Sequence, residues 1–258
     1  MKKIIFLLSF TFLILQSCSS GDSNSSNNPL LSGKLKRIHL ILSNGTNTYS
    51  NYFYDNNGSL VKITETNESG SITAQSITLV RNNNGKIINQ LFVDYAGGVQ
   101  INTDYVLDSN GFYLSSNKTY TGASNSPISA TYFYSNNKIS QINFSDGNKE
   151  KYTYDTNGNL LKTEKASVNS SWLTDGNYTY DNKENPLQYD NVLLSEFGSG
   201  SLGNNNATSL NTVNRPENFA TIIQYNYNAD NKPLSASYTR SNSQSTQIIS
   251  GTHEYFYY

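Results

Sequence analysis

Hydrophobic and polar residues alternate in short runs along most of the chain, and each run ends in a polar turn that a new apolar run follows. The clearest example is residues 152–160, where Tyr152 and Tyr154 flank a threonine, residues 155–158 read Asp-Thr-Asn-Gly, and Leu160 follows. Side chains alternate between the faces of a strand, so both tyrosines point the same way. Asp favours the start of a type I turn and Gly its left-handed end, and the segment therefore predicts a β-hairpin.

Versions of this hairpin unit return along the chain. They occupy residues 52–63, 79–87, 105–113, 132–139, 178–187 and 225–234. The positions that we align with Tyr154 recur at intervals of about 20 to 27 residues, and they are Tyr54, Val80, Leu107, Tyr134 and Tyr180. This spacing fits two strands and two connections per repeat. In the last two units, we expect a longer turn that ends in proline to replace the glycine.

The two ends of the repeat region carry complementary halves of the unit. Residues 33–38 match the half after the turn, and residues 255–258 match the half before it. We therefore expect the last strand to pair with the first. No amphipathic helix is available to cover the sheet, which must bury one face and protect its edges. The predicted fold is all-β, an antiparallel meander that closes into a barrel or a strongly wrapped sheet, with a two-layer β-sandwich as the alternative.

Residues 30–258 are expected to form a single domain. Within it, residues 191–220 widen the gap between two units, and they represent either a degenerate repeat or an insertion. This segment carries scattered apolar residues among Gly and Asn. We expect it to pack into or across the barrel opening as a plug.

The N-terminus is typical of a lipoprotein signal peptide, predicted over residues 1–17. Lys2 and Lys3 precede a short apolar run that ends at Leu15, and Cys18 follows closely. The apolar run is too short to span a bilayer comfortably. The order of these features resembles a bacterial lipobox, which implies that Cys18 becomes the lipidated first residue. Residues 18–29 are polar and predict a flexible tether to the membrane.

Composition narrows the functional classes. The chain has 17 Gly and 20 Tyr but only 14% charged residues, with a net charge of −1. This balance argues against a nucleic-acid surface, which needs a clustered basic face. Because Cys18 is the only cysteine, its acylation leaves none for a disulfide, thiol catalysis or a metal site. No cofactor is expected.

The hairpin units resemble the YD repeats of Rhs-type and teneurin-type proteins, and residues 146–160 match that pattern best. In those large proteins the repeats coil into a hollow β-shell. With its lipobox, the whole chain is more similar to small Bacteroidetes-type lipoproteins of unknown function, a group described as having a porin-like β fold. This resemblance implies a β fold and an address at the outer membrane, facing the periplasm or the cell surface.

A membrane-spanning barrel needs strands of about 9 to 11 residues with apolar side chains toward the lipid. Here only the residues flanking each turn are apolar, and strand middles such as residues 145–151 are polar. We therefore expect the barrel to stand in water, held to the membrane only by its anchor.

Few residues suggest metal binding or catalysis. His39 and His253 lie in terminal half-units and approach each other if the chain closes, but they lack evident carboxylate partners for a zinc site. The Asp-x-Asn-Gly turns beginning at Asp55, Asp108 and Asp155 resemble calcium loops weakly, and turn chemistry already explains them. We predict no metal site and no catalytic residues.

The preferred function is non-enzymatic binding or scaffolding, with a glycan or an envelope protein as partner. The candidate ligand-binding residues lie in the 191–220 segment, and they are Phe197, Leu202, Asn204, Asn205 and Asn206. One alternative is a carrier that holds a small apolar or glycan ligand in the barrel lumen. Another is a glycoside hydrolase, which requires two carboxylates facing each other across a pocket.

Overall fold

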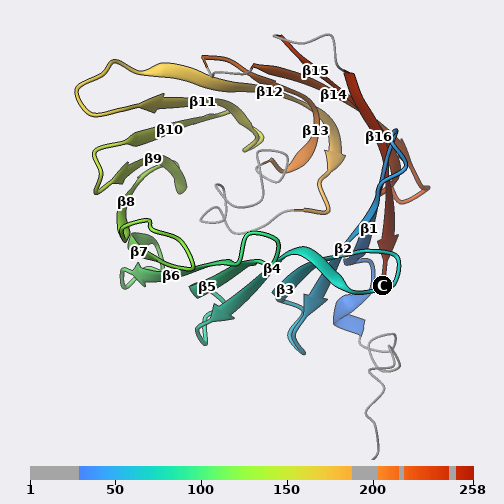
Figure 1. Ribbon diagram of the computed structural model, residues 1–258, viewed down its shortest axis with the longest axis horizontal. Helices are drawn as coiled ribbons and strands as arrows, with labels where there is room; N and C mark the ends of the chain where they lie inside the picture. The colour runs from blue at the N-terminus through green and yellow to red at the C-terminus, as the bar shows by residue number, and fades with distance from the viewer. Residues whose placement is uncertain (1–28, 188–202, 215–217, 244–247) are drawn as a thin grey trace, which may run out of the picture.

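A computed structural model describes residues 29–187, 203–214, 218–243 and 248–258. Within these residues, sixteen antiparallel strands follow one another around a closed barrel, and β16 returns to pair with β1 (Figure 1). The predicted all-β meander and its closure into a barrel are confirmed, and the sandwich alternative is not adopted. The elements are η1 (Pro29–Leu31), β1 (Leu35–Leu42), β2 (Asn47–Tyr54), β3 (Leu60–Thr66), β4 (Ile72–Arg81), β5 (Ile87–Asp94), β6 (Val99–Leu107), β7 (Tyr113–Thr121), β8 (Ile128–Ser135), β9 (Lys138–Phe144), β10 (Lys149–Tyr154), β11 (Leu160–Ala166), β12 (Leu173–Glu184), β13 (Asn205–Thr212), β14 (Phe219–Tyr227), β15 (Pro233–Asn242) and β16 (Ile248–Tyr257).

The complementary half-units at the chain ends close the barrel. β1 pairs with β16 from Leu35 opposite Tyr257 to Leu42 opposite Gly251. Beyond the strand ends, the Gly33 N–H donates to the Tyr258 carbonyl oxygen at 3.1 Å. Because closure leaves no edge strand exposed, the sheet has no free template for pairing with another chain.

The repeated turns have the predicted chemistry. In the first one, Asp55 Oδ1 accepts hydrogen bonds from the N–H groups of Asn57 and Ser59, at 2.9 and 2.8 Å. Gly58 has a φ of 74°, in the left-handed region that glycine adopts without strain. The register of β2 and β3 shifts between Phe53 and Tyr54, as expected for a bulge beside the turn.

Side chains at the turn end tie neighbouring units together. The Tyr54 hydroxyl donates to the Leu35 carbonyl oxygen at 2.9 Å, and the Tyr257 hydroxyl donates to the Pro233 carbonyl oxygen at 3.0 Å. In the second unit, Arg81 Nε donates to the Leu60 carbonyl oxygen at 3.1 Å. We call the tyrosines at the turn ends, such as Tyr54 and Tyr257, the tyrosine ladder, and these bonds make it part of the barrel's structure.

The position of Arg81 corrects our alignment of the second unit. We aligned Val80 with Tyr54, but Arg81 pairs with Ile87 as Tyr54 pairs with Leu60, while the Val80 side chain is 48% exposed. A bulge inserts one residue, so the side chains beyond it change face. Matching Val80 to Tyr54 because both are apolar therefore shifts the aligned register by one residue.

The last two units also differ from expectation. The turn at residues 228–232 is as long as the glycine turns, and Asn231 takes the left-handed position with a φ of 60°. The unit at residues 178–187 makes no tight hairpin, since β12 continues to Glu184 and pairs with β13, which begins at Asn205. Asn tolerates the left-handed region better than other non-glycine residues, which explains the first difference.

Part of the 191–220 segment belongs to the barrel wall. β13 lies between β12 and β14 in the barrel, and β14 begins at Phe219. Residues 188–202 and 215–217 lie outside the described residues, so the plug stays a prediction for that part.

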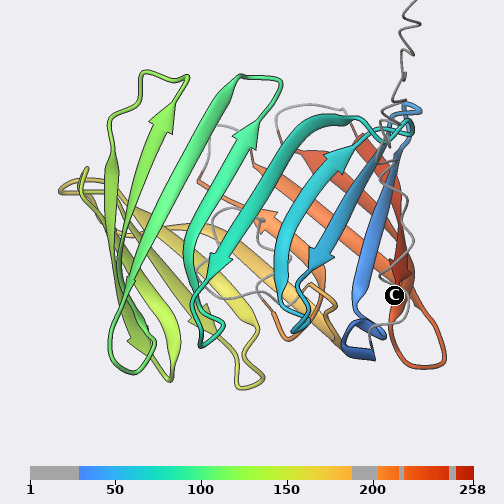
Figure 2. The same ribbon diagram turned by 90° about the horizontal axis from the view of Figure 1, so that it is seen from below.

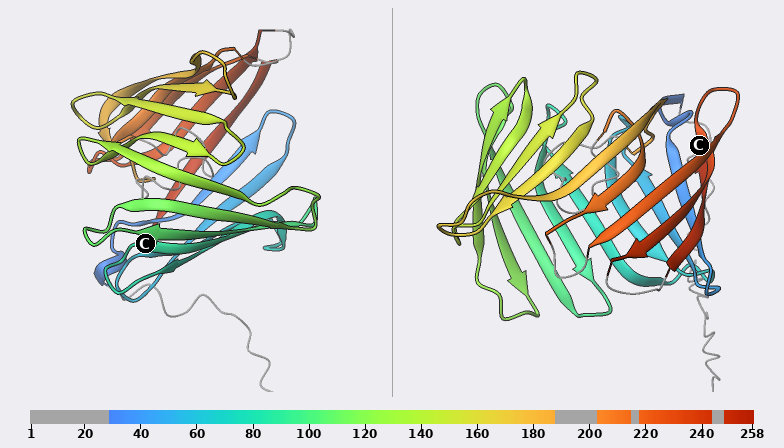
Figure 3. Two further views of the ribbon diagram at one scale, coloured as in Figure 1. Left: turned by 90° about the vertical axis from the view of Figure 1, so that its left-hand side faces the viewer. Right: turned by 90° about the horizontal axis from the view of Figure 1, so that it is seen from above.

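The barrel wall has distinct faces. The inner face carries buried tyrosines and aliphatic side chains, including Tyr52, Ile139 and Leu160. The outer face carries polar groups along the strands, such as Asn89, whose Nδ2 donates to Asn102 Oδ1 at 2.9 Å and to Asp104 Oδ1 at 2.7 Å. The strands lean relative to the barrel axis, and turns line both ends (Figure 2). The remaining sides of the wall are visible in Figure 3. Some exposed apolar side chains of the outer face lie beside the turns of the repeated units, and examples are Phe53, Val106, Phe133 and Leu161, while Ile222 lies in the middle of β14.

Candidate functional site

A cavity of about 380 Å³ opens in the barrel lumen along six consecutive strands, from β6 to β11. Its mouth is at the turn between β9 and β10, where Asp146 and Asn148 line it, and at Ser167, which follows β11. This end of the barrel is opposite the end that carries the turns of the repeated units, such as residues 55–58 and 155–158, because each strand joins the two ends. A closed sheet of this many strands leaves room inside for such a space.

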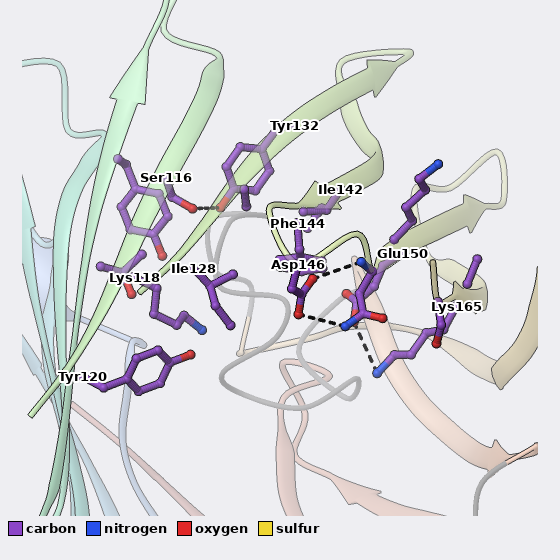
Figure 4. A pocket seen from close by; sticks show the side chains of 17 residues that line it. Ser116, Lys118, Tyr120, Ile128, Tyr132, Ile142, Phe144, Asp146, Glu150 and Lys165 are labelled. Atoms are coloured by element: carbon purple, nitrogen blue, oxygen red, sulfur yellow. Dashed lines mark hydrogen bonds and ion pairs between the residues drawn. The ribbon is translucent and has the colours of Figure 1, made fainter. Parts of the chain in front are cut away.

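The inner part of the cavity is apolar and aromatic. Tyr105, Ala130 and Ile142 line it and are buried, each less than a tenth exposed. Tyr132 lies beside them, and its hydroxyl shares a hydrogen bond of 2.8 Å with Ser116 Oγ (Figure 4). An aromatic ring with a polar edge suits ligands that are partly apolar and partly wet.

The mouth is polar and charged. Lys118 and Tyr120 lie on one side, with Asp146, Glu150 and Lys165 on the other (Figure 4). Both carboxylate oxygens of Asp146 accept hydrogen bonds from Asn148, from its N–H at 3.0 Å and from its Nδ2 at 2.8 Å. These contacts fix the turn that borders the opening.

Thr103 contributes an unusual polar group to the cavity wall. Its side chain is 2% exposed, and its Oγ1 has no hydrogen-bond partner among the described residues. A buried hydroxyl without a partner costs roughly 1 to 3 kcal/mol of stability. The residue borders the cavity, but its hydroxyl oxygen is buried in the wall and is not accessible from the cavity.

Lys165 links two carboxylates on neighbouring strands. Its Nζ lies 3.3 Å from Glu150 Oε1 and 3.7 Å from Asp175 Oδ2. Glu150 also accepts a short hydrogen bond from the Tyr152 hydroxyl. Burial, followed by the neighbouring Glu150 carboxylate, raises the pKa of Tyr152 far above its ordinary value, so Tyr152 remains a hydrogen-bond donor at neutral pH.

The candidate residues that the structure describes, Asn204, Asn205 and Asn206, do not line this cavity. Phe197 and Leu202 lie outside the described residues, as does Cys18. Asn204 directly precedes β13, and Asn205 and Asn206 are its first two residues. The side chains of all three form hydrogen bonds within the protein. Asn204 Nδ2 donates to the Asn157 carbonyl oxygen at 2.6 Å, Asn205 accepts from Asn159, and the 2%-exposed Asn206 donates to the carbonyl oxygens of Lys183 and Glu184.

The two histidines are close in the sheet but point to opposite faces. His253 lies opposite Leu40, one position from His39, which lies opposite Glu254. His39 Nδ1 is 3.0 Å from Glu254 Oε2, while burial lowers the pKa of His253. Side chains of adjacent residues alternate, so the pair cannot share a ligand. Among the described residues, no group of three or more His, Cys, Asp and Glu side chains could hold a metal ion.

The aspartates of the repeated turns accept hydrogen bonds from backbone N–H groups. Asp108 Oδ1 accepts from Asn110 and Phe112, both at 2.8 Å. This is the role that turn chemistry predicts.

Within the described part of the chain, no helix is long and apolar enough to cross a membrane.

The sequence raised a lumen ligand as an alternative but did not identify the residues that line the cavity, because they come from strands that only the register brings together. Glu150 and Lys165 are paired across the hairpin of β10 and β11. The sequence shows residues 145–151 merely as polar. Strand alternation could have indicated one of these residues. Glu150 lies two positions before the inward-facing Tyr152 and therefore points to the same face.

Comparisons with known proteins agree on the fold. No protein-family model matches the chain, and no curated protein matches it. Among solved structures, a porin-like protein from Bacteroides uniformis is 15% identical, with a TM-score of 0.56, over 88% of this chain and 98% of that one. A porin-like protein from Bacteroides vulgatus is 13% identical, with a TM-score of 0.42, over 88% of this chain and 99% of that one. The first likeness shows a shared barrel fold, and the second is too weak to carry an argument.

Proposed function

We propose that this protein is a lipid-anchored barrel of the cell envelope that binds a small glycan in its lumen cavity without altering it chemically. The observation that carries the proposal is the cavity of about 380 Å³, whose wall combines aromatic rings with charged side chains. Its volume falls within the range of about 300 to 1,000 Å³ that is common for small-ligand sites.

The lining favours a glycan over a purely apolar ligand. Five charged residues border the cavity, and an acyl chain would bury them without offering hydrogen bonds. Sugar rings present hydroxyl groups at their edges and apolar C–H groups on their faces. Tyr105, Tyr120, Tyr132 and Phe144 provide surfaces for those faces, and the charged groups suit the hydroxyls.

Binding without catalysis is the reading that the carboxylates support. Glu150 and Asp175 are both held by the Lys165 ammonium group, and Glu150 also accepts from Tyr152. A glycoside hydrolase needs one carboxyl group as acid and a second as base or nucleophile. Carboxylates that share one lysine are arranged to receive hydrogen bonds from a ligand.

The envelope location rests on the sequence and on the outer wall. The lipobox places a lipidated Cys18 before the described chain. The outer face carries the polar network of Asn89, Asn102 and Asp104 where a lipid-facing barrel carries apolar residues. The barrel thus stands in water beside an outer membrane, toward the periplasm or the cell surface, and does not span the bilayer.

The binding proposal is tested with the full chain in detergent against a glycan array, and each hit is measured by titration calorimetry. Tyr120→Ala removes an aromatic face of the lining, and we expect it to weaken glycan binding about fivefold to tenfold. Thr103→Val removes a hydroxyl that is buried in the wall, so it should leave binding unchanged and the barrel as stable or more stable. Thr131→Val, on the wall face opposite the lumen, should change neither.

Two results would contradict the proposal. The first is uniform absence of binding on the array, which would favour a scaffolding role. The second is equal affinity in the wild-type chain and in Tyr120→Ala. The anchor is tested separately, by labelling cells with a traceable fatty acid. Label in the wild-type chain and its absence in Cys18→Ser are expected, and protease treatment of intact cells then reports which side of the membrane the barrel faces.

A further inference from the structure

A second and smaller cavity, of about 180 Å³, lies beside the first at the same end of the barrel. It is lined by the loop after β11, by the start of β12 and by Asn214. The two cavities share Lys165 and Ser167. They are therefore neighbouring parts of one depression, with Lys165 at the junction.

A carboxylate lies on each side of Lys165, at the junction of the two cavities. Glu150 lines the lumen cavity, Asp175 lines the second cavity, and Lys165 is within ion-pair distance of both. The Lys165 side chain is 52% exposed and lines both cavities, so a ligand in the depression can contact it. A ligand that passes over this point meets a donor with an acceptor on either side.

We infer that the two cavities are consecutive subsites for a linear oligosaccharide, which crosses Lys165 where one sugar unit joins the next. This inference rests on the proposed function and adds the length and path of the ligand. The second cavity alone is smaller than about 300 Å³, the lower end of the usual range for a small-ligand site. It is useful to a ligand as an extension of the first.

The lining of the second cavity fits a further sugar unit. Thr174 and Asp175 contribute polar groups, and Leu173, whose side chain is 53% exposed, offers an apolar surface. Asn214 Nδ2 donates to the Thr174 carbonyl oxygen at 2.8 Å and fixes this side of the depression.

The test is a length series. Malto-, cello-, xylo- and chito-oligosaccharides of one to six sugar units are titrated into the full chain, with calorimetry as the readout. We expect affinity to rise about tenfold at the length that first reaches the second cavity, which is the gain from one added hydrogen bond and an apolar contact.

Variants separate the subsites. Leu173→Ala and Thr174→Val should lower the affinity of the longer sugars to that of the shorter ones and leave the shorter ones unaffected. Leu161→Ala, on the outer wall, is the matched control. Affinity independent of length, or an equal loss for short and long sugars in both variants, would overturn the two-subsite arrangement while leaving lumen binding in place. Absence of binding by every series would overturn the proposed function together with this inference.

Discussion

The hydroxyl of Tyr54, at the end of β2, donates a 2.9 Å hydrogen bond to the carbonyl oxygen of Leu35, the first residue of β1. Leu35 is 1% exposed, so its carbonyl oxygen has little access to water. The bond joins the first complete hairpin unit to the half-unit that closes the barrel. It is the contact through which one repeat stabilises the preceding one.

Replacing Tyr54 by Phe should destabilise the barrel by about 1 to 3 kcal/mol, because a buried carbonyl oxygen loses its donor. Chemical denaturation followed by circular dichroism measures the change. Tyr49→Phe is the control, since the Tyr49 hydroxyl has no hydrogen-bond partner among the described residues and its ring stacks on His39 outside the barrel. Equal stabilities for the two variants would show that the inter-unit bond has no net effect.

A second prediction contrasts adjacent leucines. Leu160 is fully buried on the inner face, while Leu161 is 40% exposed on the outer face. Leu160→Ala should cost about 2 to 5 kcal/mol through lost burial and the cavity left behind. Leu161→Ala should stay within about 0.5 kcal/mol of the wild-type chain. Denaturant midpoints decide the matter, and a larger loss for Leu161→Ala would mean that the bulge turns the strand the other way.

The parts of the fold that were predictable from the sequence are those written in local chemistry. A turn of Asp, two polar residues and Gly specifies its own hydrogen bonds, as at Asp155, whose Oδ1 accepts from the Asn159 N–H at 2.8 Å. Complementary ends predict closure because each half-unit lacks its partner strand. Both features repeat, so each copy supports the others.

Long-range register was not predictable in the same way. Arg81 takes the place of Tyr54, although Val80 is the better apolar match, because the bulge decides which residue points inward. The lumen cavity depends on the registers of six strands together, and an error of one residue in any of them turns Glu150 or Thr103 outward. A single sequence provides no measure of that register.

The turn at residues 82–85 allows backbone strain to be tested apart from packing. Gly85 has a φ of 76°, and a Cβ atom there would meet nothing within 4 Å. Gly85→Ala should therefore destabilise by about 1 kcal/mol through the left-handed backbone alone. Gly85→Asn should cost less, because Asn231 already occupies the corresponding position with a φ of 60°. Thermal unfolding of the two variants gives the comparison, and an Ala variant as stable as the Asn variant would contradict it.

The tyrosine ladder makes the barrel sensitive to alkaline pH. Burial raises the pKa of ladder phenols above the ordinary value of about 10, as at Tyr54, Tyr154 and Tyr257. A raised folded-state pKa contributes stability that is fully present below pH 10 and is lost as the pH rises toward the folded-state value. We expect the contribution of these tyrosines to the free energy of unfolding to be constant below pH 10 and to fall steeply above it.

Tyr154→Phe isolates one phenol of that set. The Tyr154 hydroxyl is buried and has no hydrogen-bond partner among the described residues, so its removal should leave stability at neutral pH unchanged or higher. Above pH 10, each phenol that only the unfolded chain ionises steepens the loss by about 1.4 kcal/mol per pH unit. The variant should therefore lose stability less steeply than the wild-type chain, as measured by denaturation at stepped pH with phenolate absorbance recorded in parallel. Parallel slopes in the two proteins, or a wild-type phenolate absorbance that exceeds that of the variant near pH 10 while the strand signal persists, would mean that Tyr154 ionises freely in the folded barrel.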